Sequence, residues 1–292
     1  MASIHILRRR ILAAQNVSKT TRAMQMIAAS KLKKAQAATL ATRPYVEKLS
    51  TVTKRVATRA PQEFTHPYLT PKNANGKKLL VLFAPDKGLC GGLITNLLRE
   101  FLRYTREEKG LRVVTVGKKV ESFVITLRSE VIASFVFGTT TPSFNMVLPI
   151  TKMINDEYLL GNVASVHILA THFTSIFSQK PIMTTLLPIS LPLPQEEQEK
   201  SEGGQYLFEP NVTELLSPLL NHYLEMVVYQ YLLESFVSEQ AARMVAMQNA
   251  TSNAKDVIED LRLEYNKTRQ ARITNEILDI SGADALRGVQ NE

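Results

Sequence analysis

The sequence has little of what marks disulfide-bonded, metal-binding or membrane-spanning proteins. Its single cysteine, Cys90, excludes an intramolecular disulfide framework and suits a reducing compartment. No apolar run reaches the roughly 18 residues that a bilayer-spanning helix needs. The five histidines have no metal-ligand spacing, and no base lies near Cys90 in the sequence. We therefore expect no metal site, no cofactor and no catalytic residue.

Glycine and proline are missing from both ends of the chain. Only one of the 13 prolines and two of the 12 glycines lie outside residues 60–218, and the 63 residues of 219–281 have neither. Since proline costs about 3 kcal/mol and glycine about 1 kcal/mol inside a helix, two long helices are expected to flank a central domain. We expect Pro44 to kink or interrupt the first helix and Gly282 to end the second.

Acidic residues are almost absent from residues 1–59. This segment holds 13 Lys and Arg against one acid, Glu47, whereas the other 233 residues hold 22 basic and 26 acidic ones. A basic helix suits nucleic acid, anionic lipid or an acidic protein surface. No aromatic residue precedes Tyr45, so a base-stacking platform is missing, and an acidic protein partner is favoured over nucleic acid. A merely solvated helix explains the charge equally well.

Each expected helix carries a seam of small or apolar residues at steps of three and four, apart from one step of five between Thr268 and Ile273 in the second helix. The first seam is Ile4, Leu7, Ile11, Ala14, Val17, Thr21, Met24, Ala28, Leu32 and Ala35. The second seam is Met247, Ala250, Ala254, Val257, Leu261, Tyr265, Thr268, Ile273, Ile277 and Ile280. Two such seams in one chain predict an antiparallel coiled coil of the N- and C-terminal helices.

The centre alternates between strand and helix patterns. Strands are expected over 78–84, 111–116, 130–137 and 163–173, and helices over 91–108 and 142–160, with Pro149 bending or breaking the latter. His167 and His172 are expected on opposite faces of one strand. Such alternation favours a Rossmann-like α/β domain with parallel pairing. The domain boundaries that follow are 1–59, 60–210 and 211–292, with a loop over 188–204.

The segment Asp86–Gly92 (DKGLCGG) follows an apolar strand and opens a helix. Phosphates bind at such places in α/β proteins. The segment matches neither GxGxxG nor GxxxxGK[ST], so a tight turn is the preferred interpretation. A nucleotide-binding α/β enzyme remains a further hypothesis.

The chain resembles the gamma subunit of the F-type (proton-translocating) ATP synthase from end to end. The residues that carry the resemblance are 20–32 (TTRAMQMIAASKL), 86–92 (DKGLCGG), 238–247 (SEQAARMVAM), 265–276 (YNKTRQARITNE) and 280–283 (ISGA). The start directly in the first helix resembles bacterial members of this family.

The resemblance implies a non-catalytic rotor. The paired helices would form a shaft inside a ring of alternating alpha and beta subunits, and the central domain would lie beside the epsilon subunit and the membrane ring of c subunits. The expected location is the cytoplasmic side of the cell inner membrane, as a peripheral protein. A basic coiled-coil nucleic-acid-binding protein is the alternative, and a salt-dependent affinity for duplex DNA would favour it.

The resemblance also implies roles for single residues. Contacts with beta-subunit loops would come from Arg269, Gln270, Thr274 and Glu276. Met24 and Arg243 would lie where the two helices face each other and an acidic segment of the beta subunit. The foot near the c ring and epsilon would include Tyr206, Phe208 and Glu209. Arg272 stands where small residues are frequent in the family, and no role is inferred for it.

Overall fold

A computed structural model of the protein describes residues 4–59, 66–70, 73, 76–108, 110–127, 129–189, 209 and 211–289, with side chains up to Leu278. The chain divides into two compact units. The shaft unit consists of Met1–Ile27 and Ala246–Glu292, and the central unit is Ala28–Val245. Two long helices, α1 (Ile4–Ala57) and α5 (Val212–Val289), contribute residues to both units.

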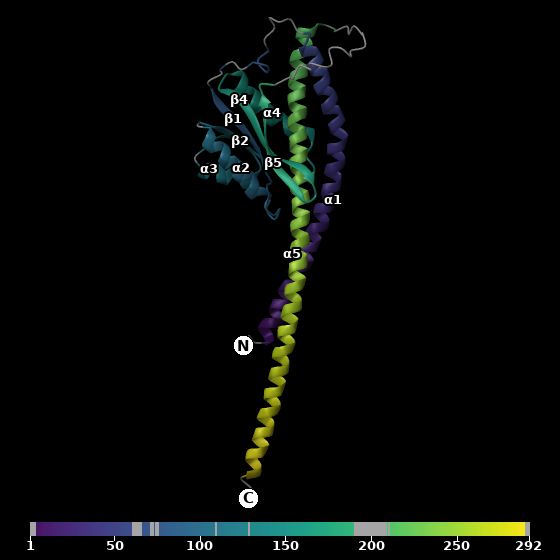
Figure 1. The fold of residues 1–292 in the computed structure, drawn as a ribbon, viewed down its shortest axis with the longest axis vertical. Helices are drawn as coiled ribbons and strands as arrows, with labels where there is room; N and C mark the ends of the chain where they lie inside the picture. Colours follow the sequence, from purple (N-terminus) through teal and green to yellow (C-terminus); the bar gives the residue numbers. More distant parts are fainter. Residues whose placement is uncertain are drawn as a thin grey trace. The chain divides into compact units, whose positions relative to one another are not determined.

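The two terminal helices confirm the expectation drawn from the missing glycines and prolines, but Pro44 does not interrupt the first helix and Gly282 does not end the second. Pro44 lies inside α1 and does not interrupt it, so Figure 1 shows α1 as one ribbon. A proline removes one hydrogen bond of the helix, and the bonds on either side hold the helix together. Helix α5 also passes Gly282 and continues to Val289, because a glycine ends a helix only where its backbone leaves the helical region.

The central unit holds a five-stranded sheet in the order β3-β2-β1-β4-β5. The first four strands are parallel, and β5 pairs antiparallel with β4, which confirms the expected Rossmann-like α/β architecture. The strands are β1 (Lys77–Phe83), β2 (Arg112–Val116), β3 (Glu130–Phe135), β4 (Val163–Ser175) and β5 (Ser178–Leu187). The connecting helices are α2 (Leu93–Glu107), α3 (Lys118–Thr126), the 3-10 turn η1 (Phe144–Met146) and α4 (Val147–Leu159).

Helices cover both faces of this sheet. Helices α2 and α3 pack on one face, around Leu97 and Val120. Helix α4 and the central-unit parts of α1 and α5 pack on the other, where α5 presents a buried residue at every fourth position: Leu216, Leu220, Leu224, Val228, Leu232 and Phe236. His167 lies near Tyr104 of α2, whereas His172 binds Glu234 of α5, which confirms their opposite faces.

Three features of the central unit differ from the sequence expectation. Helix α3 was not expected, because its Val and Ile residues also suit a strand. Strand β5 was not expected either, and it contains Pro181, which is tolerated because β5 is an edge strand. Pro149 does not break α4, since it falls in the first turn, where backbone N–H groups have no intrahelical partner.

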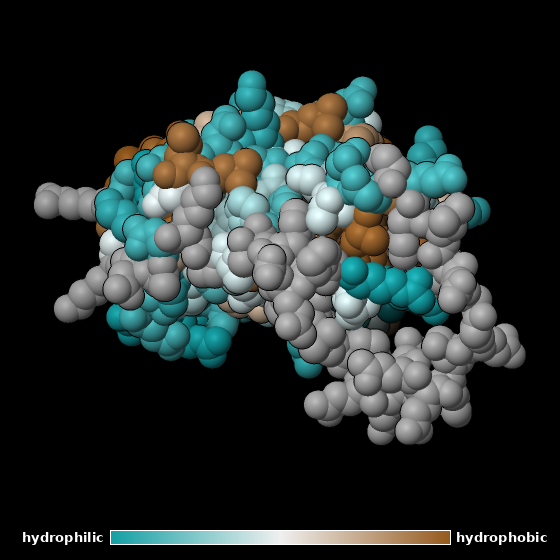
Figure 2. All heavy atoms as spheres, turned by 90° about the horizontal axis from the view of Figure 1, so that it is seen from above, coloured by the Kyte–Doolittle hydropathy of each residue, from teal (hydrophilic) through white to brown (hydrophobic). Residues whose placement is uncertain are grey.

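The face of the molecule seen from above is mixed in character (Figure 2). Seen from above in Figure 2, hydrophobic side chains form several separate areas among hydrophilic ones. Among the described residues, no helix combines the length and the apolar character needed to cross a bilayer.

Candidate functional site

The turn at the end of β1 lies where doubly wound sheets bind their ligands. Its backbone takes the left-handed conformation at Leu89 (φ 63°) and Gly91 (φ 58°). The Asp86 carboxylate accepts hydrogen bonds from the backbone N–H groups of Lys118 (3.0 Å), Phe137 (3.2 Å) and Gly138 (2.7 Å). The protein's own carboxylate therefore caps the N-terminus of α3, a place where an anionic ligand would otherwise be favoured.

Helix α5 covers the start of α2 at the same turn. Cys90 and Leu93 pack against Ala242 of α5 in a small buried cluster. Burial raises the pKa of the Cys90 thiol, which makes it a poor nucleophile. The turn is thus held by the backbone contacts of Asp86 and by the packing of Cys90 against α5. These contacts agree with its interpretation as a tight turn rather than a nucleotide site.

A buried ion pair on α5 holds this turn. The Arg243 Nη1 atom lies 2.7 Å from the Glu239 Oε1 atom, and the two side chains are 12% and 5% exposed. Arg243 also donates to the carbonyl oxygens of Lys87 (3.1 Å) and Gly88 (3.3 Å). Burial raises the pKa of Glu239, and the Arg243 guanidinium opposes that rise. We call Glu239, Arg243 and the two carbonyl oxygens the α5 latch. The latch joins segments that lie about 150 residues apart in the chain, and no sequence motif could have predicted this contact.

In the shaft unit, α1 and α5 form the expected antiparallel seam with a stricter spacing than the sequence indicated. The least exposed positions of α1 include Ile4, Leu7, Ile11, Ala14, Ser18, Thr21 and Gln25. On α5 they include Met247, Thr251, Ala254, Ile258, Leu261, Tyr265 and Thr268. These positions follow a seven-residue repeat without drift, which is the pattern of a left-handed coiled coil.

Six expected seam residues were therefore wrong, and the side chain of a further one, Ile280, lies outside the described residues. Met24 and Ala250 are half-buried, but their neighbours Gln25 and Thr251 occupy the seam positions. Val17 is 52% exposed and Val257 is 49% exposed, and the seam uses their neighbours Ser18 and Ile258 instead. Ile273 and Ile277 are exposed as well.

A hydroxyl pair lies inside the seam. The Thr21 and Thr251 Oγ1 atoms are 2.7 Å apart, and Thr251 also donates to the Met247 carbonyl (2.8 Å). A polar pair inside a coiled coil fixes the register of its helices, because any slip would leave both hydroxyls without their partner.

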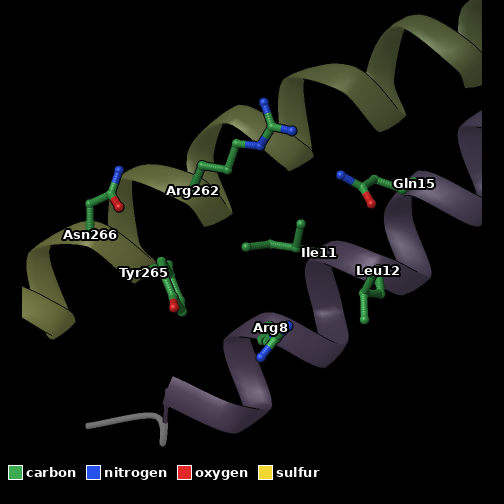
Figure 3. Close-up of a pocket in the computed structure, with 7 residues that line it drawn as sticks. All are labelled: Arg8, Ile11, Leu12, Gln15, Arg262, Tyr265 and Asn266. Atoms are coloured by element: carbon green, nitrogen blue, oxygen red, sulfur yellow. The ribbon is translucent and has the colours of Figure 1, made fainter.

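Shallow pockets flank the seam. One of about 610 Å³ is lined by Arg8, Ile11, Leu12, Gln15, Arg262, Tyr265 and Asn266. Figure 3 shows Ile11 and Tyr265 between the two helices, with Arg262 projecting from α5. A second pocket of about 380 Å³ is lined by Arg22, Gln25, Gln248, Thr251, Ser252 and Lys255.

The residues expected to touch a beta subunit do not form one cluster. Arg269, Gln270, Thr274 and Glu276 are all exposed on α5 in the shaft unit. There Thr274 donates to the Gln270 carbonyl (3.0 Å) and Arg272 pairs with Glu276 (2.7 Å). Arg272, for which the sequence indicated no role, is thus the ion-pair partner of Glu276.

The remaining expected residues lie elsewhere. Met24 is half-buried beside the seam of the shaft unit, whereas Arg243 belongs to the α5 latch of the central unit. At the expected foot, Glu209 is exposed, and Tyr206 and Phe208 lie outside the described residues, as does most of the loop expected over 188–204. In the part of the chain that the structure describes, no three His, Cys, Asp or Glu side chains come together as metal ligands.

Comparison with known proteins gives one consistent family. A family model described as ATP synthase matches residues 3–286. The ATP synthase gamma chain of Dehalococcoides mccartyi is 43% identical over 289 residues, which cover 98% of this chain and 99% of the relative. The ATP synthase gamma chain of Nitrosococcus oceani is 39% identical over 289 residues, with the same coverage of 98% and 99%.

Solved structures agree with this result. A chain of the Euglena gracilis mitochondrial ATP synthase matches with a TM-score of 0.71 at 19% identity, over 99% of this chain and 96% of that chain. A chain of the Tetrahymena thermophila mitochondrial ATP synthase, in a structure of its central stalk and c ring, matches with a TM-score of 0.59 at 26% identity, over 79% and 99%.

Proposed function

This chain belongs to the ATP synthase gamma-chain family, as a central-stalk subunit of an F-type ATP synthase, and from that premise we propose that it is a non-catalytic rotor. It carries rotation between a proton-driven ring of c subunits and a head of alternating alpha and beta subunits, where the chemistry of ATP takes place. The nucleic-acid-binding alternative has no support from the family.

The drift-free seam of the shaft unit is the observation that carries the proposal. A rotor has to resist bending and twisting, and two helices wound together resist both better than one helix does. The Thr21–Thr251 pair adds a fixed register, so the helices do not slide along each other under load. Because one chain supplies two different helices, the shaft has no rotational symmetry and presents a different face to each surrounding subunit.

The central unit holds α5 in a fixed position. The ladder of buried residues from Leu216 to Phe236 fixes α5 against the sheet, and the rings of Phe236 and Phe137 stack with centroids 6.1 Å apart. The α5 latch adds a second attachment at the turn after β1. With both attachments, a turning force on the sheet passes into α5 and does not merely move a loop.

The proposed contacts with the beta subunits use exposed polar side chains of α5. Arg269, Gln270, Thr274 and Glu276 lie on two successive helical turns and are exposed to loops of the head. We place Met24 and Arg243 at further beta-subunit contacts; for Arg243, its engagement in the latch makes this an indirect role, through the shape of the turn. The foot, with Tyr206, Phe208 and Glu209, meets the c ring and the epsilon subunit.

The proposed partners are the alpha and beta subunits, the epsilon subunit and the c ring. The solved neighbours belong to assemblies described as F1/c-ring and as central stalk with c ring. We assign the rotor segments to 1–59, 60–210 and 211–292, and the location to the cytoplasmic side of the cell inner membrane, as a peripheral subunit.

Reconstitution tests this function. All the other subunits of the ATP synthase are reconstituted in proteoliposomes, with and without this chain, and ATP synthesis driven by a proton gradient is measured. Coupled synthesis should require the chain, whereas the chain alone should neither bind ATP tightly nor hydrolyse it. Full coupled synthesis without the chain, or ATP hydrolysis by the chain alone, would refute the proposal.

A further inference from the structure

A short turn of the central unit, residues 66–70, is tied to α5 through a buried histidine. His66 is 7% exposed. Its Nδ1 atom accepts a hydrogen bond from the backbone N–H of Tyr68 (3.1 Å), and its Nε2 atom lies 2.9 Å from the Ser217 Oγ atom of α5. The Tyr68 hydroxyl makes a second tie, because it donates to the Asn221 Oδ1 atom of α5 (3.3 Å). We call His66, Tyr68, Ser217 and Asn221 the His66 clamp.

These bonds fix the protonation state of the imidazole. A backbone N–H can only donate, so the Nδ1 atom of His66 has to present its lone pair to Tyr68. The ring is then neutral, with its proton on Nε2, which donates to the Ser217 hydroxyl. A second proton would enter at Nδ1 and meet the N–H of Tyr68. Protonation of His66 and this hydrogen bond therefore exclude each other.

The surroundings of the ring agree with a neutral imidazole. Burial lowers the pKa of His66. The Tyr68 ring lies 5.0 Å from the imidazole, and the ring of Tyr158, from α4, lies 6.5 Å from Tyr68. Burial raises the pKa of both tyrosines, and Glu225 of α5 adds to the rise for Tyr68. Both phenols therefore stay neutral in the pH range where a histidine titrates.

The same turn is attached to both ends of the segment 190–211, which contains the proposed foot residues. The Tyr68 carbonyl accepts a hydrogen bond from the backbone N–H of Ile189 (2.7 Å), the last described residue before this segment. At its other end the segment leads into α5, which the clamp holds at Ser217 and Asn221. One turn of five residues thus fixes where the foot segment begins and where it ends.

The stability of the clamp has to depend on pH. All four clamp residues line a pocket of about 660 Å³, so water can bring a proton to the buried ring. An open turn, with an ordinary histidine pKa of about 6.5, takes up a proton more readily than the closed turn does. The clamp therefore has its full stability above about pH 6.5 and loses it as the pH falls. Between about pH 7.5 and about pH 5.5 the ratio of open to closed turn should rise about tenfold.

We propose that His66 is a proton-operated clamp on the foot of the rotor. Neutral His66 holds both ends of the foot segment, at Ile189 and at α5. Protonated His66 lets the 66–70 turn come away, and the foot then no longer follows α5 rigidly. This inference deepens the proposed rotor function and rests on it. Acidification around the central unit thus lowers the transmission of rotation while the sheet stays folded.

Amide hydrogen exchange of the full chain tests the clamp. The protection of the 66–70 turn and of Ile189 is measured at about pH 7.5 and about pH 5.5, each relative to an unstructured peptide at the same pH. We expect about tenfold less protection at the lower pH. His66→Asn keeps an acceptor for the N–H two residues on but takes up no proton, so its protection should change by less than about twofold.

His222→Gln is the matched control. His222 is a neighbouring histidine of α5 that the clamp does not use, since its Nε2 atom lies 2.8 Å from the Tyr45 hydroxyl and its Nδ1 atom 3.5 Å from the Glu225 Oε2 atom. This variant should show the same tenfold loss as the unaltered chain. Equal protection of the unaltered chain at both pH values would overturn the inference, and this measurement does not depend on any variant. A tenfold loss that persists in His66→Asn, or disappears in His222→Gln, would overturn it as well.

Proton pumping by the assembled complex connects the clamp to the rotor. The protons pumped per ATP hydrolysed are compared at the same two pH values for complexes with the unaltered chain and with His66→Asn. The ratio should fall on acidification with the unaltered chain, and His66→Asn should lessen the fall. If both complexes lose the same share of their ratio, or neither loses any, the clamp does not act on transmission and this inference is refuted while the rotor function stands. If coupled synthesis does not need the chain at all, the rotor function itself fails, even where the exchange results hold.

Discussion

The α5 latch makes a quantitative prediction for Arg243→Ala. The substitution removes the ion pair with Glu239 and two hydrogen bonds to the turn after β1. Removing one partner of a buried ion pair leaves the other charge without compensation, which costs about 3–5 kcal/mol. We therefore expect the free energy of unfolding of the central unit to fall by this amount at neutral pH.

The chain contains a matched control for this variant. Arg272 and Glu276 form an Arg–Glu pair with the same sequence spacing and the same 2.7 Å distance, but their side chains are 61% and 56% exposed. An exposed pair of this kind contributes about 0.3–0.5 kcal/mol at most, so Arg272→Ala should be nearly neutral. The pair that Arg243→Ala breaks is buried and comes with two hydrogen bonds to the turn, whereas the pair that Arg272→Ala breaks is exposed.

The loss in Arg243→Ala should depend on pH. Burial raises the pKa of Glu239. In the folded chain the Glu239 carboxyl therefore stays protonated at pH values where a Glu carboxyl of the unfolded chain, with a pKa of about 4.3, has already lost its proton. The folded state then binds more protons than the unfolded state, and stability falls as pH rises through that window. Without Arg243 the window extends to higher pH, so the variant should be less impaired at about pH 5 than at about pH 8.

Urea unfolding of the full chain, together with amide hydrogen exchange of the 86–92 turn, measures these effects. The double variant Glu239→Gln/Arg243→Ala should recover part of the lost stability, because no charge stays buried. A loss under about 1 kcal/mol in the single variant would refute the reasoning. So would a double variant as unstable as the single one, or turn amides that exchange as slowly as in the unaltered chain.

Three further variants address other parts of the chain. Phe236→Ala should lower the free energy of unfolding by about 3–5 kcal/mol, because it empties a fully buried site that stacks on Phe137; a loss under about 1 kcal/mol in urea unfolding would contradict this packing. Met24→Lys adds a charge beside the seam of the shaft unit, and it should reduce the protons pumped per ATP hydrolysed more than it reduces assembly; an unchanged ratio argues against it. Gln270→Leu should slow turnover of the assembled complex through lost polar contacts of about 1–3 kcal/mol, and wild-type turnover would count against a contact there.

The coiled coil shows what sequence patterns predict well and where they mislead. The absence of glycine and proline from both ends of the chain was sufficient to predict both long helices, because the free-energy cost of either residue inside a helix acts locally. The seam was predicted correctly except where an apolar residue stands next to the true position, and beyond Thr268, where Ile273 and Ile277 are exposed. Val17 is more hydrophobic than Ser18, yet the seven-residue repeat of the supercoil selects Ser18. Geometry over several turns decided this position, and hydrophobicity at a single residue did not.

The turn after β1 shows the opposite case. Its place between a strand and a helix was readable from the sequence, because strand and helix patterns adjoin it directly. Its engagement by Arg243 was not readable, since the contact joins segments about 150 residues apart and depends on how α5 lies over the sheet. Arg243 on its own looks like any surface arginine of a helix, and only the fold reveals that its side chain is only 12% exposed.

The shaft unit combines a specific register with modest intrinsic stability. Its seam contains Ser18, Thr21, Gln25 and Thr251 where leucine would bury more apolar surface, so the hydrophobic contribution is small. In addition, Ile273 on the α5 segment beyond the seam is exposed. A long helix in water gains little from propensity alone and depends on what packs against it. An enclosing alpha/beta head would supply that packing. The chain itself therefore has to fix the register of the two helices, while much of the stability of the shaft unit can come from assembly.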